Sequence, residues 1–423
     1  MILLSKTIFT HISQLVTPLG NREKHGKEMS QFLKLKDAAV VVENGYISAV
    51  GTTAEIMEKE NEACEIRNLE GHAVLPGFVD SHTHFIFGGY RPEEFMMRLQ
   101  GVPYIEIHKA GGGIQNTVEA TRKLTFQEMY ELGKIRLKDA LSMGVTTVEG
   151  KSGYGLDQEC ELMQLEVMKK LNQDQPASVV STYLGAHSIP TEYKNNPEAY
   201  IDWMIEKMLP YIKEKDLAEF VDVFCENGVF STVQSERLLH AAKKLGFQVK
   251  IHADEIASTG GAELAADLDG ISADHLLMIS EEGIEKLAKS RTTATLLPCT
   301  AFCLNKPYAP ARKMIDAGCA VALASDYNPG SCFTNSVPLM FALAVMHMGM
   351  TLDEAVCALT LNGAAALGLA DCIGSIEQGK KADFVILETP SYEYLVYHTC
   401  KNLVKEVIKE GKTVYTREDI LWK

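Results

Sequence analysis

The pattern of hydrophobic and polar positions changes twice along this 423-residue chain. Over roughly the first seventy residues, apolar and polar side chains alternate in short runs, as they do in strands. The segment AAVVVENGYISAVG has two apolar runs around Asn44-Gly45, a dipeptide that favours a β-hairpin. The first part of the chain is therefore expected to form a small β-structure.

From residue 73 to residue 372, short apolar runs alternate with helix-like stretches. FQEMYELGKIRLKDALSMG and SERLLHAAKKLG are two such stretches, and Gly246 is expected just past the end of the second helix. Strands are expected at 73–82, 144–151, 178–187, 220–224, 247–255, 270–275, 292–298 and 320–326. Eight strands that alternate with helices predict a TIM-like (β/α)8 barrel of the α/β class.

The strand pattern returns after residue 373, in GSIEQGKKADFVILE and LVKEVIKEGKTVY. Because the two ends of a domain commonly lie close together, both chain ends are expected to build one small β-sandwich domain. The expected domains are thus 1–72 with 373–423 for the β-domain, and 73–372 for the barrel.

Composition narrows the choice of partners and location. The formal net charge is −15, which disfavours nucleic acid and anionic membranes but leaves room for a small anionic substrate beside a local arginine. Ten cysteines without a CxxC motif indicate reduced thiols in the cytoplasm. The sequence offers no signal peptide and no transmembrane stretch, so a cytoplasmic location is expected.

The strongest local chemical signal is the run Asp80-Ser81-His82-Thr83-His84. In a strand, residues i and i+2 point to the same face, so the two histidines can converge on one point. Neutral imidazoles suit zinc, iron or nickel. Two surface histidines in a loop would give the same motif, so the motif needs further partners.

Further partners follow other predicted strands. His252 lies at the end of the fifth strand, His275 ends the sixth and Asp326 ends the eighth. In a (β/α)8 barrel, catalytic groups gather at the C-terminal ends of the strands. Four histidines and one aspartate on one rim indicate a metal-dependent enzyme better than they indicate separate structural roles.

Several segments resemble the amidohydrolase superfamily over nearly the whole chain. These are PGFVDSHTH, KIHADE, SADH and LASDYNPGS, together with the flanking β-segments. The segments FGGYRPEEFMMRLQGVPYIEI, AGGGI, EGKSGYGL and YLGAHSIP resemble more closely a branch of that superfamily that acts in histidine degradation. The substrate of that branch is 4-imidazolone-5-propanoate.

The resemblance implies a metal held by His82, His84, His252 and Asp326. In two-metal relatives a carboxylated lysine on the fourth strand bridges the ions, but the fourth strand here, FVDVFCENG, contains no lysine. One divalent ion per chain, zinc or iron, is therefore expected. Lys151 ends the second strand, where it either pairs with a carboxylate such as Glu149 or contacts substrate.

The resemblance also places residues around the substrate, which has a propionate tail. Arg91 follows a Gly-Gly loop and can clamp a carboxylate through two hydrogen bonds. His187 ends the third strand on the same rim. The remaining substrate contacts that the resemblance implies are Tyr104, Tyr154, Glu255, Asn328, Gly330 and Ser331. For the tyrosines, packing is the alternative reading, and for Gly330 it is a Pro-Gly turn.

The reaction that the resemblance implies is hydrolytic ring opening to N-formimidoyl-L-glutamate by a metal-activated hydroxide. Asp326 is expected to take a proton from water, and His275 to orient that water or stabilise the oxyanion. Glu255, three residues after His252, is the candidate proton shuttle or ring-nitrogen anchor.

Two alternatives stay open on the sequence. Purine and pyrimidine deaminases share the histidines and the aspartate but differ in their substrate loops, and they release ammonia. A non-catalytic barrel that serves as a scaffold would usually lack metal ligands, which are complete here. A homodimer is one expectation for the assembly, because it is the commonest closed form.

Overall fold

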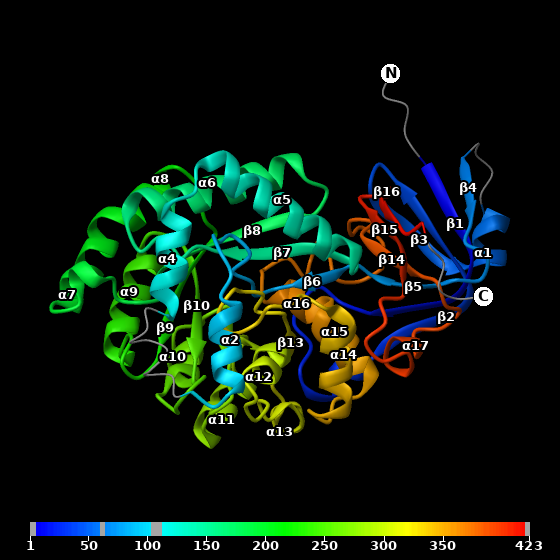
Figure 1. Cartoon of the computed structure of the whole chain (residues 1–423). Coiled ribbons are helices and arrows are strands. Elements are labelled where there is room, and N and C mark those ends of the chain that lie inside the picture. The colour runs from blue at the N-terminus through cyan, green and yellow to red at the C-terminus, as the bar shows by residue number, and fades with distance from the viewer. Residues whose placement is uncertain (1–5, 60–63, 103–111, 419–423) are drawn as a thin grey trace.

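The computed structural model describes residues 6–59, 64–102 and 112–418. Figure 1 shows two parts, a barrel surrounded by helices and a sheet beside it. The barrel holds the larger hydrophobic core, and the sheet has a core of its own that includes Phe9, Val40 and Phe384. Each part is thus built around its own buried apolar side chains.

The barrel consists of eight parallel strands that follow one another in chain order, which confirms the predicted alternation. The strands are β6 (Phe78–Asp80), β7 (Val145–Lys151), β8 (Ser178–Ala186), β9 (Phe220–Cys225), β10 (Gln248–Ala253), β11 (Ser272–His275), β12 (Thr293–Leu296) and β13 (Val321–Leu323).

Helices lie between the strands and around the barrel (Figure 1). The longer ones are α2 (Pro92–Leu99), α4 (Ile114–Arg122), α5 (Phe126–Ser142), α6 (Gln158–Asp174), α9 (Thr232–Lys244), α11 (Glu281–Lys289), α14 (Val337–Met346) and α15 (Leu352–Leu359). The shorter ones are α7 (Pro197–Trp203), α8 (Leu209–Glu214), α10 (Gly261–Asp267), α12 (Pro298–Cys303), α13 (Ala311–Ala317) and α16 (Leu361–Ala365). Capping boxes start α5, α9 and α15, and Gly246 follows α9 with a φ of 82°, as its sequence predicts.

The first and last strands of the barrel meet at the HxH motif. The backbone N–H of Asp326 donates to the carbonyl of His82 over 2.9 Å, and that of His84 donates to the carbonyl of Tyr327 over 3.0 Å. Residues that follow β6 and β13 therefore close the barrel. This closure brings the HxH motif and Asp326 together.

Both ends of the chain contribute to one mixed sheet, which confirms the composite β-domain. Its strands are β1 (Lys6–Pro18), β2 (Phe32–Glu43), β3 (Tyr46–Thr52), β4 (Glu65–Asn68), β5 (Ala73–Pro76), β14 (Phe384–Leu387), β15 (Val404–Lys409) and β16 (Lys412–Thr416). The order is β16-β15-β14-β5-β1-β2-β3, with β4 beside β1. The expected hairpin joins β2 to β3, and both Asn44 and Gly45 have positive φ, as its tight turn requires.

The stretch 73–82, expected as one strand, is two strands that belong to different sheets. β5 pairs with β1 and β14 in the composite sheet, whereas β6 pairs with β7 in the barrel. Gly77 separates them, and a Cβ at this position would lie 2.4 Å from the hydroxyl oxygen of Thr146. The absence of a side chain lets the chain pass from one sheet to the other. The domain limits given above stay a prediction.

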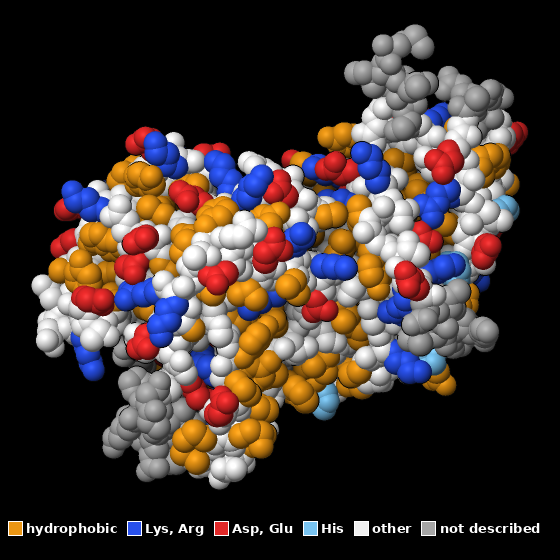
Figure 2. Space-filling model, turned by 45° about the horizontal axis from the view of Figure 1, so that its top comes forward, with side chains coloured by type: hydrophobic (Ala, Val, Ile, Leu, Met, Phe, Trp, Pro, Cys, Tyr) orange, Lys and Arg blue, Asp and Glu red, His pale blue; other side chains and the backbone are white. Residues whose placement is uncertain are grey.

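The surface is of mixed charge on the face that Figure 2 shows, where basic and acidic side chains are interspersed. Within the described part of the chain, no helix has the length and apolar character that crossing a membrane requires.

Candidate metal centre

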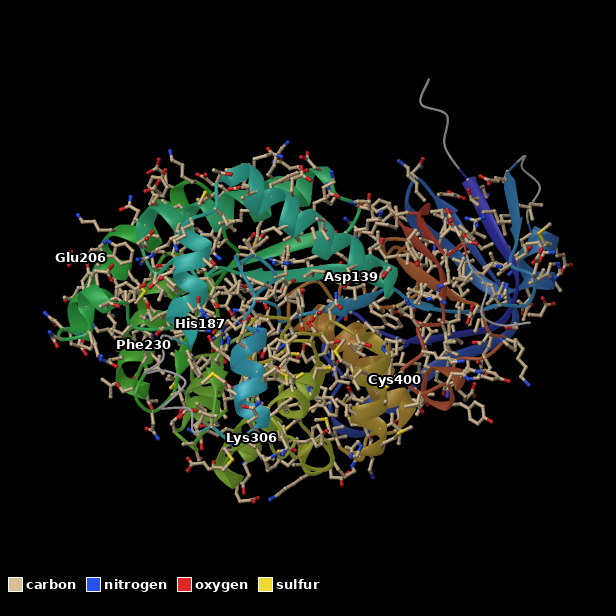
Figure 3. All side chains as sticks on the ribbon, in the orientation of Figure 1. Asp139, His187, Glu206, Phe230, Lys306 and Cys400 are labelled. Carbon is tan, nitrogen blue, oxygen red and sulfur yellow. The ribbon has the colours of Figure 1, made fainter. Side chains whose placement is uncertain are left out.

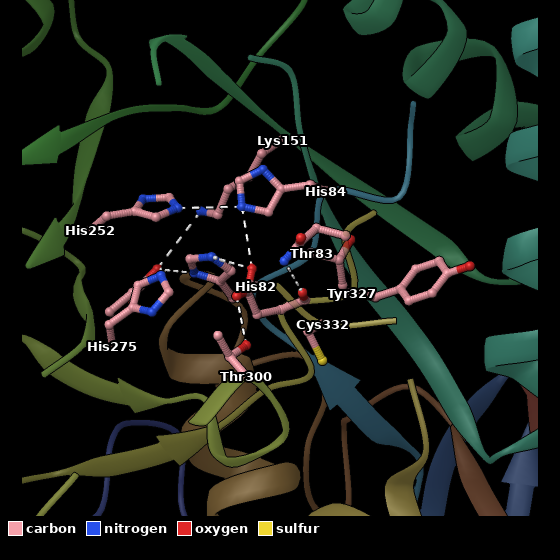
Figure 4. A network of polar contacts seen from close by, with 12 residues as sticks. His82, Thr83, His84, Lys151, His252, His275, Thr300, Tyr327 and Cys332 are labelled. Atoms are coloured by element: carbon pink, nitrogen blue, oxygen red, sulfur yellow. Dashed lines mark hydrogen bonds and ion pairs between the residues drawn. The ribbon is translucent and has the colours of Figure 1, made fainter. Parts of the chain in front are cut away.

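The two histidines of the HxH motif point into the barrel just beyond β6 (Figure 4). Both are buried, with 0% of His82 and 2% of His84 exposed. Nδ1 of His82 lies 2.6 Å from Oδ2 of Asp274, a carboxylate that can only accept. His82 therefore carries its proton on Nδ1, and its Nε2 presents a lone pair to the centre of the site.

Four donor atoms converge at this centre. Oδ1 of Asp326 lies 3.5 Å from Nε2 of His82 and 3.4 Å from Nε2 of His84, and the latter lies 3.4 Å from Nε2 of His252. Ligands placed about 2.0–2.1 Å from one ion at tetrahedral corners are about 3.3–3.4 Å apart. The spacing of the donors thus fits a single tetrahedral ion.

The protonation of the imidazoles also fits a metal. Burial holds the pKa of both His82 and His84 well below the ordinary value, so the rings are neutral and their lone pairs are free. Nε2 of His82 is buried and has no hydrogen-bond partner among the residues that the structure describes. A cation at the centre would give Nε2 of His82 the partner that a buried polar atom needs.

The candidate ligand on β10, His252, contacts Asp222 of β9 through the side of its ring that faces away from the centre. Its Nδ1 lies 3.0 Å from Oδ2 of Asp222. Burial opposes the charged form of His252, but Asp222 outweighs this effect and raises the pKa of the ring. A more basic imidazole is a stronger metal ligand, so Asp222 both orients His252 and strengthens it.

The position of Asp326 is set by a hydrogen bond to its own carboxylate and by contacts that hold the residue before it. The hydroxyl of Thr300 donates to its Oδ2 over 2.7 Å, which leaves Oδ1 directed at the histidines. Asp80 accepts from the backbone N–H and the hydroxyl of Ser325 and so holds the preceding residue. Burial raises the pKa of Asp326 to about 7, which suits a group that takes up and releases a proton.

Beneath the ligands lies a set of buried charges that the sequence analysis identified only in part. Lys151 contacts Glu149 and Asp222, each at 2.8 Å, which confirms the ion-pair reading of this residue. Asp222, Lys250, Asp274 and Thr300 were not singled out. For Lys250 the sequence carries a signal, because a charged residue two places before His252 in an apolar strand faces the same side as that histidine.

His275 and Glu255 lie beside each other near the ligand set. Nδ1 of His275 is 3.6 Å from Oε1 of Glu255. Burial holds the pKa of His275 well below its ordinary value, whereas burial and the charge of Asp326 raise the pKa of Glu255 to about 8. Glu226 accepts from the backbone N–H groups of Ile256 and Ala257 and so fixes the loop that carries Glu255. At neutral pH, Glu255 is thus a protonated acid held in place.

Arg91 lies at the end of the loop that follows the HxH motif. Its guanidinium is 3.3 Å from Glu94 through Nη1, while its Nε is buried without a hydrogen-bond partner in the described residues. Glu94 also accepts from the backbone N–H of Gly113. Arg91 therefore keeps donors in reserve for a second carboxylate.

The loop after Asp326 runs past Arg91 and is held by Asn328. The side chain of Asn328 accepts from the N–H groups of Gly330 and Ser331 and donates to the carbonyl of Asp326. The hydroxyl of Ser331 also contacts Asn328. The structure thus gives Asn328 a loop-shaping role, and the substrate contacts of these three residues stay a prediction.

Tyr154 and His187 lie on the other side of the ligands. The ring of His187 stacks on that of His84 at 4.9 Å, and the ring of Tyr154 lies 5.2 Å from His187. Figure 3 labels His187 in the barrel half of the molecule. Nδ1 of His187 lies 3.1 Å from the carbonyl of Gly153, which fixes the proton there and leaves Nε2 as an acceptor. Tyr104 lies outside the described residues.

The loop that carries Tyr154 is held by a buried carboxylate. Glu161, on α6, accepts from the backbone N–H groups of Gly153, Gly155 and Leu156 over 2.8–3.1 Å. These contacts hold the loop that carries Tyr154, and the charges of Arg91 and Asp326 both affect the pKa of its phenol. Burial raises the pKa of this phenol, so it stays protonated and can donate a hydrogen bond.

Known proteins resemble this chain over most of its length. The sequence profile described as "Amidohydrolase family" matches residues 73–414. A curated protein named imidazolonepropionase from Parabacteroides distasonis is 56% identical over 410 residues, covering 96% of this chain and 98% of that protein. One of the same name from Clostridium tetani is 54% identical and covers 97% of this chain and 98% of its own.

Solved structures with a similar fold are more distant in sequence. An adenosine deaminase from Xanthomonas campestris with bound zinc has a TM-score of 0.72 at 21% identity, covering 99% of this chain and 94% of its own. Guanine deaminase from E. coli has a TM-score of 0.70 at 16% identity, covering 98% and 100%. At such identities the likeness shows the fold alone, and the fold agrees with the predicted barrel and composite β-domain.

Proposed function

This chain belongs to the amidohydrolase family, in its imidazolonepropionase group, and from that premise we propose that it hydrolyses 4-imidazolone-5-propanoate to N-formimidoyl-L-glutamate. The observation that carries the proposal is the loop 326–331, which begins at the ligand Asp326 and reaches Arg91 at Gly330. This loop thus connects the hydrolytic centre with Arg91, a cation that can bind an anionic tail.

We propose that His82, His84, His252 and Asp326 hold one divalent ion. Three imidazoles and a carboxylate suit zinc or iron. When bound, the ion supplies Lewis acidity, which polarises a carbonyl and lowers the pKa of water. The remaining chemistry belongs to the side chains of the protein.

Arg91 binds the propionate in this proposal. Its Nε, which has no hydrogen-bond partner among residues 6–59, 64–102 and 112–418, and the adjacent guanidinium nitrogens offer two parallel donors to a carboxylate. Tyr154, a neutral phenol, donates from the neighbouring wall. His187 has only an acceptor, Nε2, facing the site, so it accepts from a ring N–H rather than contacting the carboxylate. This assignment separates tail recognition from ring recognition.

The hydrolysis then needs two proton transfers. Water adds to the ring carbonyl carbon, and Asp326, with its pKa near neutrality, accepts the proton that the water gives up. The ring C–N bond breaks as the carbonyl re-forms, and the leaving nitrogen takes a proton from Glu255, which is protonated at neutral pH. His275, neutral and 3.6 Å from Glu255, orients that acid. Water is consumed and no ammonia is released.

Assembly and location complete the proposal. A homodimer is expected as the commonest closed assembly, and sedimentation of the purified chain tests it. A cytoplasmic location is expected because the cysteine pattern is that of reduced thiols.

An ultraviolet time course with freshly prepared imidazolonepropionate tests the function. Loss of the imidazolone absorbance with stoichiometric appearance of N-formimidoyl-L-glutamate supports the proposal. An ammonia assay on the same samples distinguishes ring opening from deamination. Turnover of purines or pyrimidines with ammonia release, and none of imidazolonepropionate, would refute the assignment.

A further inference from the structure

Five ionisable side chains lie in the barrel directly beneath the metal ligands, and all are fully buried. They are Glu149, Lys151, Asp222, Lys250 and Asp274. Buried charges are costly unless each is paired, and removal of one partner leaves an uncompensated charge. Packing alone does not account for five buried charged side chains inside a barrel, because apolar side chains would fill the same space without this cost.

The two lysines contact all three carboxylates. Nζ of Lys151 lies 2.8 Å from Oε1 of Glu149, 2.8 Å from Oδ2 of Asp222 and 3.7 Å from Oδ2 of Asp274. Nζ of Lys250 lies 2.9 Å from the same oxygen of Glu149 and 4.0 Å from Oδ2 of Asp274. Burial opposes the charged form of Lys151, but the carboxylates outweigh it and raise its pKa, so the ammonium is retained.

Two of these carboxylates connect the lysines to the metal ligands. Asp222 contacts both Lys151 and His252, and Asp274 contacts both Lys151 and His82. The charges therefore form one continuous system with the ligand set. In that system, the ammonium groups of Lys151 and Lys250 stand among the carboxylates of Glu149, Asp222 and Asp274.

We propose that Lys151 and Lys250 take the place of a second metal ion and so limit this barrel to one. Without the two ammonium groups, the buried carboxylates of Glu149, Asp222 and Asp274 would lack a cation, and a second divalent ion is the group that could compensate them. The lysines supply that compensation from within the chain. They act through the carboxylates and not on the substrate, so they are positioning residues.

Unused acceptors around Lys151 support this inference independently. Oε2 of Glu149 and Oδ1 of Asp274 are buried and have no hydrogen-bond partner in the part of the chain that the structure describes. With Asp222, these groups surround Lys151 with hard oxygen donors. If the lysine side chain is removed, the space that it leaves is lined by carboxylates from three strands, β7, β9 and β11, which suits a divalent cation.

The inference rests on the proposed metal site, and counting metal tests it without reference to turnover. Lys151→Ala removes the ammonium and leaves room for an ion. Lys151→Ala/Glu149→Gln removes the same lysine together with one carboxylate, so its net charge equals that of the parent chain. Each protein is dialysed against excess zinc and then against buffer, and bound zinc is counted by elemental analysis.

The expected result is one zinc per chain for the parent, two for Lys151→Ala and one for the charge-matched double variant. One zinc in Lys151→Ala, or two in the parent chain, overturns the inference. Two in the double variant also overturns it, because space rather than charge would then control the count. Loss of activity with these counts intact bears on the proposed function alone.

Lys151→Ala is expected to fold less readily without metal, since it leaves a charge unpaired. It is therefore also produced with zinc in the growth medium, and its thermal unfolding is followed as zinc is added. A second zinc-dependent rise in the unfolding temperature, absent from the double variant, supports the inference. If Lys151→Ala does not fold under either condition, the double variant decides: one zinc supports the inference and two contradict it.

Discussion

The guanidinium of Arg91 occupies the space that a side chain at Gly330 would fill. A Cβ built on Gly330 would lie 1.9 Å from Nη2 of Arg91, far inside van der Waals contact. Gly330 is not among the glycines with positive φ, so its backbone conformation is open to other residues. The glycine thus leaves room for the guanidinium of Arg91, and the backbone conformation alone does not call for it.

Gly330→Ala should displace the guanidinium and weaken binding of the propionate. We expect kcat/KM to fall by about 10- to 100-fold, with metal content unchanged, because the shift costs part of a buried charge-assisted contact. In an Arg91→Met background the same glycine substitution should cost little more, since residues in contact are not additive. Full additivity in this double-mutant cycle would contradict the relationship.

Arg91→Met should lower kcat/KM by roughly 30- to 1,000-fold, as expected when a charge in a pocket loses its partner. Arg91→Lys should recover only part of this loss, because an ammonium lacks the planar fork that binds a carboxylate through two bonds. Steady-state kinetics on imidazolonepropionate measure both. Unchanged kinetics in Arg91→Met would show that the tail is held elsewhere.

The purified chain should contain one tightly bound divalent ion, and His252→Ala should lose most of it. His252 supplies one of only four donor atoms, and its removal also leaves Asp222 without the imidazole that it contacts at 3.0 Å. Elemental analysis after dialysis measures both proteins. Two tightly held ions in the parent chain, or full retention in His252→Ala, would refute this ligand set.

Most of the candidate metal site could be predicted from the ends of the expected strands and from the HxH motif. Residues i and i+2 of a strand face the same side, which places His82 with His84. The topology of a barrel brings His252 and Asp326 to the same rim. The change of sheet at Gly77 was not predictable from periodicity, because β5 and β6 are both apolar and only Gly77 lies between them. Only the contact with Thr146 reveals why the chain must change sheets there.

Asp274 was not predicted for a different reason. Asp274 directly precedes His275, so parity would send their side chains to opposite faces. The structure gives His275 a φ of 77°, which leaves the strand conformation and lets both residues face the site. Such a local backbone change is set by tertiary packing and leaves no mark in the hydrophobic pattern.

Glu255 should make kcat fall at alkaline pH, which gives the pH profile an alkaline limb. Its folded pKa of about 8 means that the carboxyl is protonated below this pH and loses its proton above it. As a proton donor to the leaving nitrogen, it should support turnover below about pH 8, and kcat should fall as the pH rises through that value. Glu255→Gln should lower kcat by about 100- to 10,000-fold and remove this limb. An identical limb in Glu255→Gln would assign it to another group.

Loop 326–331 joins the proposed hydrolytic centre to Arg91, the cation proposed to bind the tail of the substrate. The most direct test compares kcat and KM for imidazolonepropionate and for the same ring without its propionate, at equal metal loading. The binding energy of the tail is expected to position the ring carbonyl, so the ring alone should show a lower kcat as well as a higher KM. A loss of at least about 100-fold in kcat/KM is the predicted result. Comparable values for the two compounds would contradict the claim.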